Sequence, residues 1–141
     1  MVDNLTPEVR SRIMASVAQK NTGPEMYVRR LLHRMGYRYA LHRRDLPGRP
    51  DLVFRPRRKV VFVHGCFWHG HTCRRGRLPT SRADYWAERI ATNQARDMRN
   101  VHDLEAAGWD VCVVWECEIS DPDLLRQRLV RFLDSEPLIL S

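Results

Sequence analysis

Residues able to do chemistry are concentrated in one short stretch of the sequence, residues 64–73. The histidines and cysteines of this stretch are His64, Cys66, His69, His71 and Cys73. Thiolates and imidazoles are the ligands that Zn²⁺ prefers in proteins, and imidazole is also the most frequent general acid or base. The stretch therefore indicates a metal site, an acid–base site or both.

The cysteine spacing favours a structural zinc site. Three ligands come from the pattern Cys66-x4-His71-x-Cys73, and Cys117, after the last apolar run, supplies a fourth. Four soft ligands leave no open position for a water molecule, as in structural sites. Alternatively, Cys66 and Cys117 are small buried hydrophobic residues, but so dense a Cys/His cluster makes zinc the better interpretation. Cys112 is expected to be a core thiol.

An acid stands at the start of an apolar run, where Asp51 follows Pro50 and precedes the residues 52–54. Asp51 could be a turn residue, or it could hold Mg²⁺ against a phosphate. His64 and His69 flank an aromatic pair. They could be satisfied polar residues at a strand end, or the base and acid of the same site.

Two further acids are candidates because of their positions. Asp97 falls on the apolar face of the long helix predicted between Ser81, or Thr80, and about Gly108. A buried carboxylate needs a partner, either an arginine or a histidine that the acid would hold in one tautomer. Glu25 stands three residues after a helix-capping threonine, and a capping box explains it on sequence grounds.

Three aromatic residues accompany these groups: Phe67, Trp68 and Trp86. They could belong to the core. Exposed aromatics beside basic residues are also suited to stacking on bases or to wedging between them.

The pattern of elements predicts one α/β domain over residues 1–141. The expected order is helix, helix, three strands, long helix, strand and helix, with the last strand parallel to its neighbour. Residues 1–22 are expected to form a helical arm that contacts DNA, and residues 137–141 a loose tail. The remaining expected elements are a helix from Thr22 to Gly36, strands at 37–41 and 109–115, a hairpin of two strands within residues 48–73 whose first strand opens at Asp51, and a helix over 124–133 that Asp121 or Ser120 starts.

The composition favours a polyanionic partner. The chain has 24 Lys and Arg against 17 Asp and Glu, a net charge of +7. Such a charge suits nucleic acid, although it could also only solvate the surface. No apolar run approaches the roughly 20 residues of a membrane span, and no secretory signal is apparent. A cytoplasmic protein without a membrane partner, and with free cysteines, is therefore expected.

Several blocks of the sequence together resemble the very-short-patch mismatch repair endonucleases. The blocks are residues 47–54 (PGRPDLVF), 64–73 (HGCFWHGHTC), 114–117 (VWEC), 10–14 (RSRIM), 85–86 (YW) and 93–97 (NQARD). This resemblance covers nearly the whole chain. It implies a restriction-endonuclease-like mixed sheet flanked by helices, and nicking of duplex DNA at the T:G mismatches that arise when 5-methylcytosine deaminates.

The resemblance also implies roles for the candidate residues of the active site. Asp51 and the backbone carbonyl of Val63 would bind Mg²⁺. His64 would be the general base, with Asp97 as its orienting partner. His69 would lie near the scissile phosphate, and Glu25 would reach the waters bound to the metal.

For the remaining residues the resemblance implies a structural zinc and a DNA wedge. The implied zinc ligands are Cys66, His71, Cys73 and Cys117, and the implied wedging aromatics are Phe67, Trp68 and Trp86. A monomer acting on double-stranded DNA with a T:G mismatch is expected, with mismatch repair proteins as possible partners.

The sequence departs from the family pattern in several places. Val63 stands where other members can carry threonine, and Gly70 and Thr72 replace histidines found in some members. The acid-x-lysine pattern of restriction nucleases is also absent. Two alternatives remain open. One is a restriction-type nuclease acting on unmodified or matched duplex DNA. The other is a zinc-stabilised DNA-binding module without cleavage. Asp51, His64 and Asp97 weigh against the second, because a binding module has no use for them.

Overall fold

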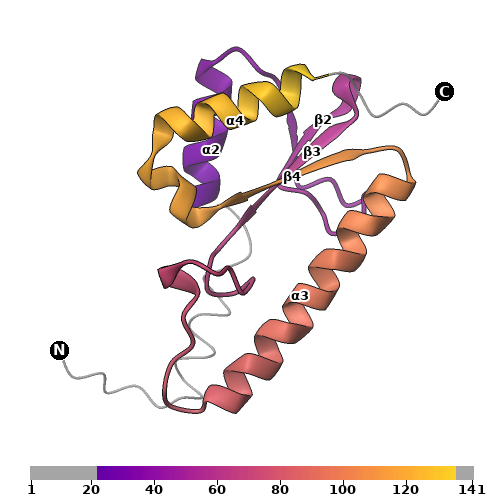
Figure 1. Cartoon of the computed structure of the whole chain (residues 1–141). Helices are drawn as coiled ribbons and strands as arrows, with labels where there is room; N and C mark the ends of the chain where they lie inside the picture. The colour runs from indigo at the N-terminus through magenta and orange to yellow at the C-terminus, as the bar shows by residue number, and fades with distance from the viewer. Residues whose placement is uncertain (1–21, 136–141) are drawn as a thin grey trace.

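A four-stranded mixed sheet lies at the centre of the molecule (Figure 1). The computed structural model describes residues 22–135. The strands are β1 (Ala40–Leu41), β2 (Leu52–Phe54), β3 (Lys59–His64) and β4 (Asp110–Trp115), in the spatial order β1-β2-β3-β4. The first three strands pair antiparallel, and β4 pairs parallel with β3. The predicted α/β class and the parallel last strand are therefore confirmed.

The central hairpin forms because two apolar runs flank a short turn. A 3-10 turn, Arg55–Arg57, joins β2 to β3, and Arg58 closes it in the left-handed region with φ of 57°. In the resulting register Leu52 lies opposite Val61 and Phe54 opposite Lys59. This antiparallel pairing brings the start of β2 beside the end of β3. Asp51, which precedes β2, therefore lies next to Val63, which precedes His64.

Helices cover both faces of the sheet, which explains why β2 and β3 are apolar on both sides. Helices α2 (Gly23–Arg34) and α4 (Pro122–Asp134) lie on one face, and α3 (Ala83–Ala106) lies on the other (Figure 1). The core under α2 and α4 consists of Val28, Leu31, Leu32, Leu52, Phe54, Val61, Cys112, Val114, Leu125, Leu129 and Leu133. The core under α3 consists of Val53, Val60, Phe62, Leu104 and Trp109.

The alternation of side chains along the strands assigns each residue to one of these two faces. Along β3, Val61 faces α2 and α4, whereas Val60 and Phe62 face α3. His64 continues the second series and therefore points toward α3. Cys112 is buried on the opposite face of β4 from Val111, as expected of a core thiol.

Two helix starts are as predicted. The Thr22 hydroxyl accepts a hydrogen bond of 3.3 Å from the Glu25 amide at the start of α2. The Asp121 carboxylate accepts one of 3.2 Å from the Leu124 amide at the start of α4. Each satisfies an amide that the helix itself leaves unpaired.

The predicted cap of α3 is wrong, although the helix begins at Ala83, close to the expected position. Neither Thr80 nor Ser81 caps the helix, which begins after Arg82 with no capping bond from its side chain. Arg82 has φ of 55°, and its guanidinium lies 4.4 Å from the centre of the Tyr85 ring. The left-handed backbone of Arg82 turns the chain into the helix. This conformation favours glycine, so an arginine at position 82 gives no sequence signal for it.

The first strand is shorter than the predicted 37–41, because only Ala40 and Leu41 pair with β2. The predicted arm at residues 1–22 lies outside the described residues except for Thr22, and the predicted tail at 137–141 lies outside them entirely. Among the helices between residues 22 and 135, none is both long and apolar enough to cross a bilayer.

Candidate active site and metal centres

Three clusters of polar side chains surround the end of β3. Asp51 joins the first cluster to the strand, because its Oδ2 atom accepts a 2.7 Å hydrogen bond from the Val63 amide. His64, the last residue of β3, belongs to the second cluster, and Cys66 in the following loop belongs to the third. One strand end therefore positions all three clusters.

The first cluster consists of Asp51, Glu25 and His42, whose possible ligand atoms all lie within 4.8 Å of one another. Glu25 projects from α2 and is only 2% exposed. Its Oε2 atom is 2.8 Å from Nε2 of His42, which follows β1 directly. The structure thus brings together the predicted Asp51 and Glu25, and it adds His42, which was not predicted.

Burial and a neighbouring acid raise the pKa of Asp51. Desolvation is the largest cause, the hydrogen bond from the Val63 amide opposes it, and Glu25 adds to it, so the pKa reaches about 7. Two carboxylates held together out of water repel each other unless a proton or a cation lies between them. The donor set therefore fits a divalent metal ion, for which carboxylate oxygens are the usual ligands.

The second cluster consists of His64, His69 and Asp97. Nδ1 of His69 lies 2.5 Å from Oδ2 of Asp97, which projects from α3. The rings of the two histidines stack, with their centres 3.7 Å apart. Asp97 was expected to be the partner of His64, but its hydrogen bond is to His69, because the loop after β3 folds back and brings the ring of His69 to the acid.

Burial lowers the pKa of His64. Desolvation is the largest cause, a charge on His69 lowers the pKa further, Asp97 opposes both, and the pKa falls to about 4. The side chain is 7% exposed and lies against the rings of Phe62 and Trp115. His64 is accordingly a neutral imidazole at physiological pH.

The third cluster brings together the four predicted zinc ligands, Cys66, His71, Cys73 and Cys117, whose ligand atoms lie within 4.8 Å of one another. Three come from the loop after β3, and Cys117 comes from the 3-10 turn (Glu116–Ser120) that follows β4. These segments meet because β3 and β4 are parallel neighbours, with His64 opposite Trp115. The ring of Trp115 also stacks on His71 at 4.2 Å, which fixes the imidazole. The cluster could hold a metal ion.

The three predicted wedge residues pack against one another edge to face. Ring centres are 5.3 Å apart for Phe67 and Trp68, 5.4 Å for Phe67 and Trp86, and 5.9 Å for Trp68 and Trp86. Trp86 is only 5% exposed, whereas Phe67 and Trp68 are half-buried. Asn93 of α3 donates a 2.9 Å hydrogen bond to the Trp68 carbonyl. In this structure Trp86 supports the other two aromatics from the α3 side.

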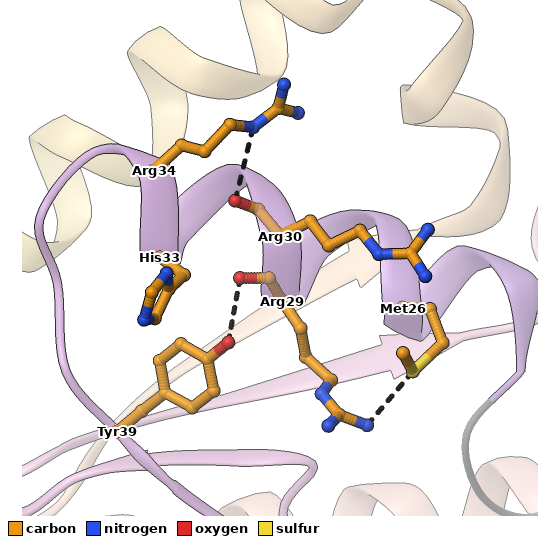
Figure 2. A pocket seen from close by; sticks show the side chains of 6 residues that line it. All are labelled: Met26, Arg29, Arg30, His33, Arg34 and Tyr39. Atoms are coloured by element: carbon orange, nitrogen blue, oxygen red, sulfur yellow. Dashed lines mark hydrogen bonds between the residues drawn. The ribbon is translucent and has the colours of Figure 1, made fainter.

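A basic pocket of about 420 Å³ lies on the surface beside α2 (Figure 2). Its lining residues are Met26, Arg29, Arg30, His33, Arg34 and Tyr39. The Tyr39 hydroxyl donates to the Arg29 carbonyl at 2.7 Å, and Nη1 of Arg29 lies 3.6 Å from Glu25 of the first cluster. One arginine of the pocket is therefore an ion-pair partner of a carboxylate in the first cluster. Arginine side chains in such a place are suited to phosphate groups.

Carboxylates able to hold a divalent ion, a histidine–aspartate pair and an adjoining basic surface are the components of a nuclease site. A family model described as DNA mismatch endonuclease Vsr matches residues 2–75. The chain belongs to this family, so it is an endonuclease, a hydrolase of DNA repair. The resemblance drawn from the sequence blocks is confirmed.

Individual relatives agree with this assignment. The chain is 58% identical to the type II nicking enzyme V.XorIIP of Xanthomonas oryzae pv. oryzae, over 95% of this chain and 98% of the relative. It is 42% identical to the type II nicking enzyme V.NmeAIP of Neisseria meningitidis, over 94% and 95%. It is 39% identical to the DNA mismatch endonuclease Vsr of Escherichia coli, over 84% and 76%.

Proposed function

We propose that this endonuclease nicks duplex DNA at T:G mismatches formed by deamination of 5-methylcytosine, on the 5′ side of the mispaired T, in a reaction that requires Mg²⁺. The observation that supports it most is the meeting of two clusters at one strand end. Asp51 is hydrogen-bonded to Val63, and His64 is the next residue along β3. The carboxylates and the histidines can therefore act on the same phosphate group.

Asp51, Glu25 and the backbone carbonyl of Val63 would hold the magnesium ion. When bound, Mg²⁺ supplies a Lewis acid that offsets the negative charge developing on the phosphoryl oxygens. The raised pKa of Asp51 supports this assignment, because burial and the neighbouring Glu25 carboxylate both disfavour a second negative charge at this position unless a cation is bound.

The hydrogen bonds favour His69 as the residue that accepts the proton of the attacking water. A carboxylate at Nδ1 of His69 fixes the tautomer whose Nε2 atom carries a lone pair, and it stabilises the ring once that ring is protonated. The neighbouring His64 stays neutral, so it does not repel the proton that His69 accepts. Asp97 orients His69, and the roles of the two histidines are exchanged relative to those implied by the resemblance.

A structural zinc bound by Cys66, His71, Cys73 and Cys117 would hold the loop after β3 in place. This loop carries His69, Phe67 and Trp68, so the metal would stabilise the active site as well as the fold. Burial raises the pKa of the Cys66 thiol to about 12. A bound cation would displace the proton of that thiol.

We also propose that the mixed sheet and its flanking helices correspond to a restriction-endonuclease-like fold.

Selectivity for the mismatch would come from Phe67 and Trp68, which are half-buried at the surface, with Trp86 behind them. Opening a base step costs a few kcal/mol, and it costs least where a mismatch already weakens the stack. An aromatic wedge therefore favours a T:G site before any base edge is read.

Strand mapping tests the proposal. A duplex with one T:G pair and separate labels on both strands is incubated with the protein, with Mg²⁺ or with a chelator. The proposal expects one cut, in the T strand, 5′ to the mispaired T, and only with metal. Equal cutting of the matched duplex would point to a restriction-type nuclease. Binding without cutting would point to a DNA-binding module.

A further inference from the structure

His42 occupies an unusual backbone conformation at the mouth of the first cluster. It follows β1 directly, and its φ of 48° lies in the left-handed region, which residues other than glycine seldom adopt. Its amide donates a 3.4 Å hydrogen bond to the Asp51 carbonyl. The turn in the chain directs the imidazole toward the carboxylates and not along the strand, and such strain is typical of functional positions.

The three side chains of this cluster bring one possible ligand atom each to within 4.8 Å of the other two. Oδ2 of Asp51 is occupied by the Val63 amide. The other oxygen, Oδ1, is the one that lies 3.9 Å from Nε2 of His42. Oε2 of Glu25 lies 2.8 Å from the same nitrogen. The imidazole thus faces both acids. A histidine whose only role was to form a hydrogen bond with Glu25 would not need to lie near Asp51 as well.

The separations are short enough for the three side chains to share one ion. Two ligand atoms that each lie about 2.0–2.1 Å from an ion are at most about 4.2 Å apart. The distances from Nε2 of His42 to Oε2 of Glu25 and to Oδ1 of Asp51, 2.8 Å and 3.9 Å, are both below that limit.

We propose that Nε2 of His42 is a direct ligand of the metal ion held by Asp51 and Glu25, and that this site consequently prefers Mn²⁺ to Mg²⁺. Oxygen ligands suit both ions, but an imidazole nitrogen favours first-row transition metals, whereas Mg²⁺ takes oxygen ligands. This inference rests on the metal site of the proposed function. It adds a nitrogen ligand and a metal preference to that site.

The first test detects the nitrogen directly in the zinc-loaded protein without DNA. Electron spin echo spectra of bound Mn²⁺ show modulation from ¹⁴N when an imidazole is coordinated, and ¹⁵N-histidine labelling identifies the source. We expect the modulation in the wild type, its loss in His42→Gln, and its retention in His69→Gln, which removes an imidazole from the second cluster. Glutamine keeps a polar side chain that can still pair with Glu25.

The second test compares affinities by calorimetry. His42→Gln should weaken Mn²⁺ binding about ten-fold or more, the scale seen when the surroundings of a metal site are altered, and should change Mg²⁺ binding less than about three-fold. His102→Gln, at an imidazole whose side chain is 83% exposed on α3, is the matched control and should change neither.

Three results would overturn the inference: wild type without nitrogen modulation, modulation that persists in folded His42→Gln, or no saturable Mn²⁺ binding. If His42→Gln does not fold, the doubly substituted His64→Gln, His69→Gln protein replaces it. Loss of the modulation there would assign the nitrogen to the second cluster. Because no readout uses DNA cleavage, failure to nick T:G duplexes would count against the proposed function alone.

Discussion

The imidazole rings of His64 and His69 stack with their centres 3.7 Å apart and their planes 5° apart. Two protonated rings at this distance would repel each other, so the stack allows one positive charge at most. His64 is the neutral ring, because burial lowers its pKa to about 4, whereas Nδ1 of His69 lies 2.5 Å from Oδ2 of Asp97. The pair therefore combines one neutral ring with one ring that is bonded to a carboxylate.

Replacing Asp97 by asparagine tests this division of roles. The amide can still hydrogen-bond to Nδ1 of His69, but it neither fixes the reactive tautomer nor stabilises the protonated ring. We expect single-turnover nicking to slow about 10²-fold or more, with DNA affinity nearly unchanged. Asp103→Asn, at an exposed position of the same helix, is the control and should retain wild-type nicking. Full activity of Asp97→Asn would remove the acid from the mechanism.

Replacing Asp51 by asparagine should stabilise the fold while abolishing cleavage. The pKa of Asp51 is raised in the folded protein to about 7, so ionisation of this group opposes folding as pH rises from about 4 to about 7. Without divalent metal, Asp51→Asn should therefore raise the free energy of unfolding by roughly 2–4 kcal/mol at pH 8. The gain should fade as pH approaches 4. Denaturant titrations at several pH values measure this, and a destabilised variant at pH 8 would contradict it.

The Cys/His cluster and the central hairpin could be predicted because their signals are local in the sequence. The apolar runs on either side of a Pro/Arg turn define β2 and β3, and the density of cysteines and histidines indicates the cluster. Parallel pairing of β4 with β3 then brings Cys117 to the other three members of the cluster. No long-range information beyond the crossover rule was needed for these features.

His42 and the partner of Asp97 could not be predicted, because they depend on pairing across the fold. His42 stands in an arginine-rich stretch, and only the register of Leu41 with Leu52 places it next to Asp51. The position of Asp97 on the apolar face of the long helix indicated correctly that its carboxylate has a partner. The return of the loop after β3 then decides that the partner is His69 and not His64.

Removing one zinc ligand should release the metal and weaken the fold. Cys117→Ser should reduce the zinc content from about one per chain to near zero and lower the melting temperature, since metal binding contributes to folding. Cys112→Ser is the matched control. That thiol is buried and accepts a hydrogen bond from Arg128 at 2.8 Å, apart from the cluster, so its loss should leave the zinc content unchanged. Equal zinc in both variants would rule out the predicted ligand set.

Replacing Trp68 by alanine should reduce selectivity more than catalysis. The variant loses the half-buried aromatic at the surface but keeps Asp51 and His69. Discrimination between T:G and matched duplexes should shrink about ten-fold or more, equivalent to roughly 1.4 kcal/mol. Met98→Ala, at an apolar position of α3 that is 74% exposed, is the control. A folded Trp68→Ala protein that keeps the full preference would show that selectivity lies elsewhere.

The central claim is that the endonuclease acts at the mismatch. It is tested most directly by the ratio of single-turnover nicking rates on two duplexes that differ only in one pair, T:G or T:A, at saturating protein and fixed Mg²⁺ and salt. A wedge worth about 1.4 kcal/mol or more predicts that T:G is cut at least about ten times faster. Equal rates on the two duplexes would contradict the account.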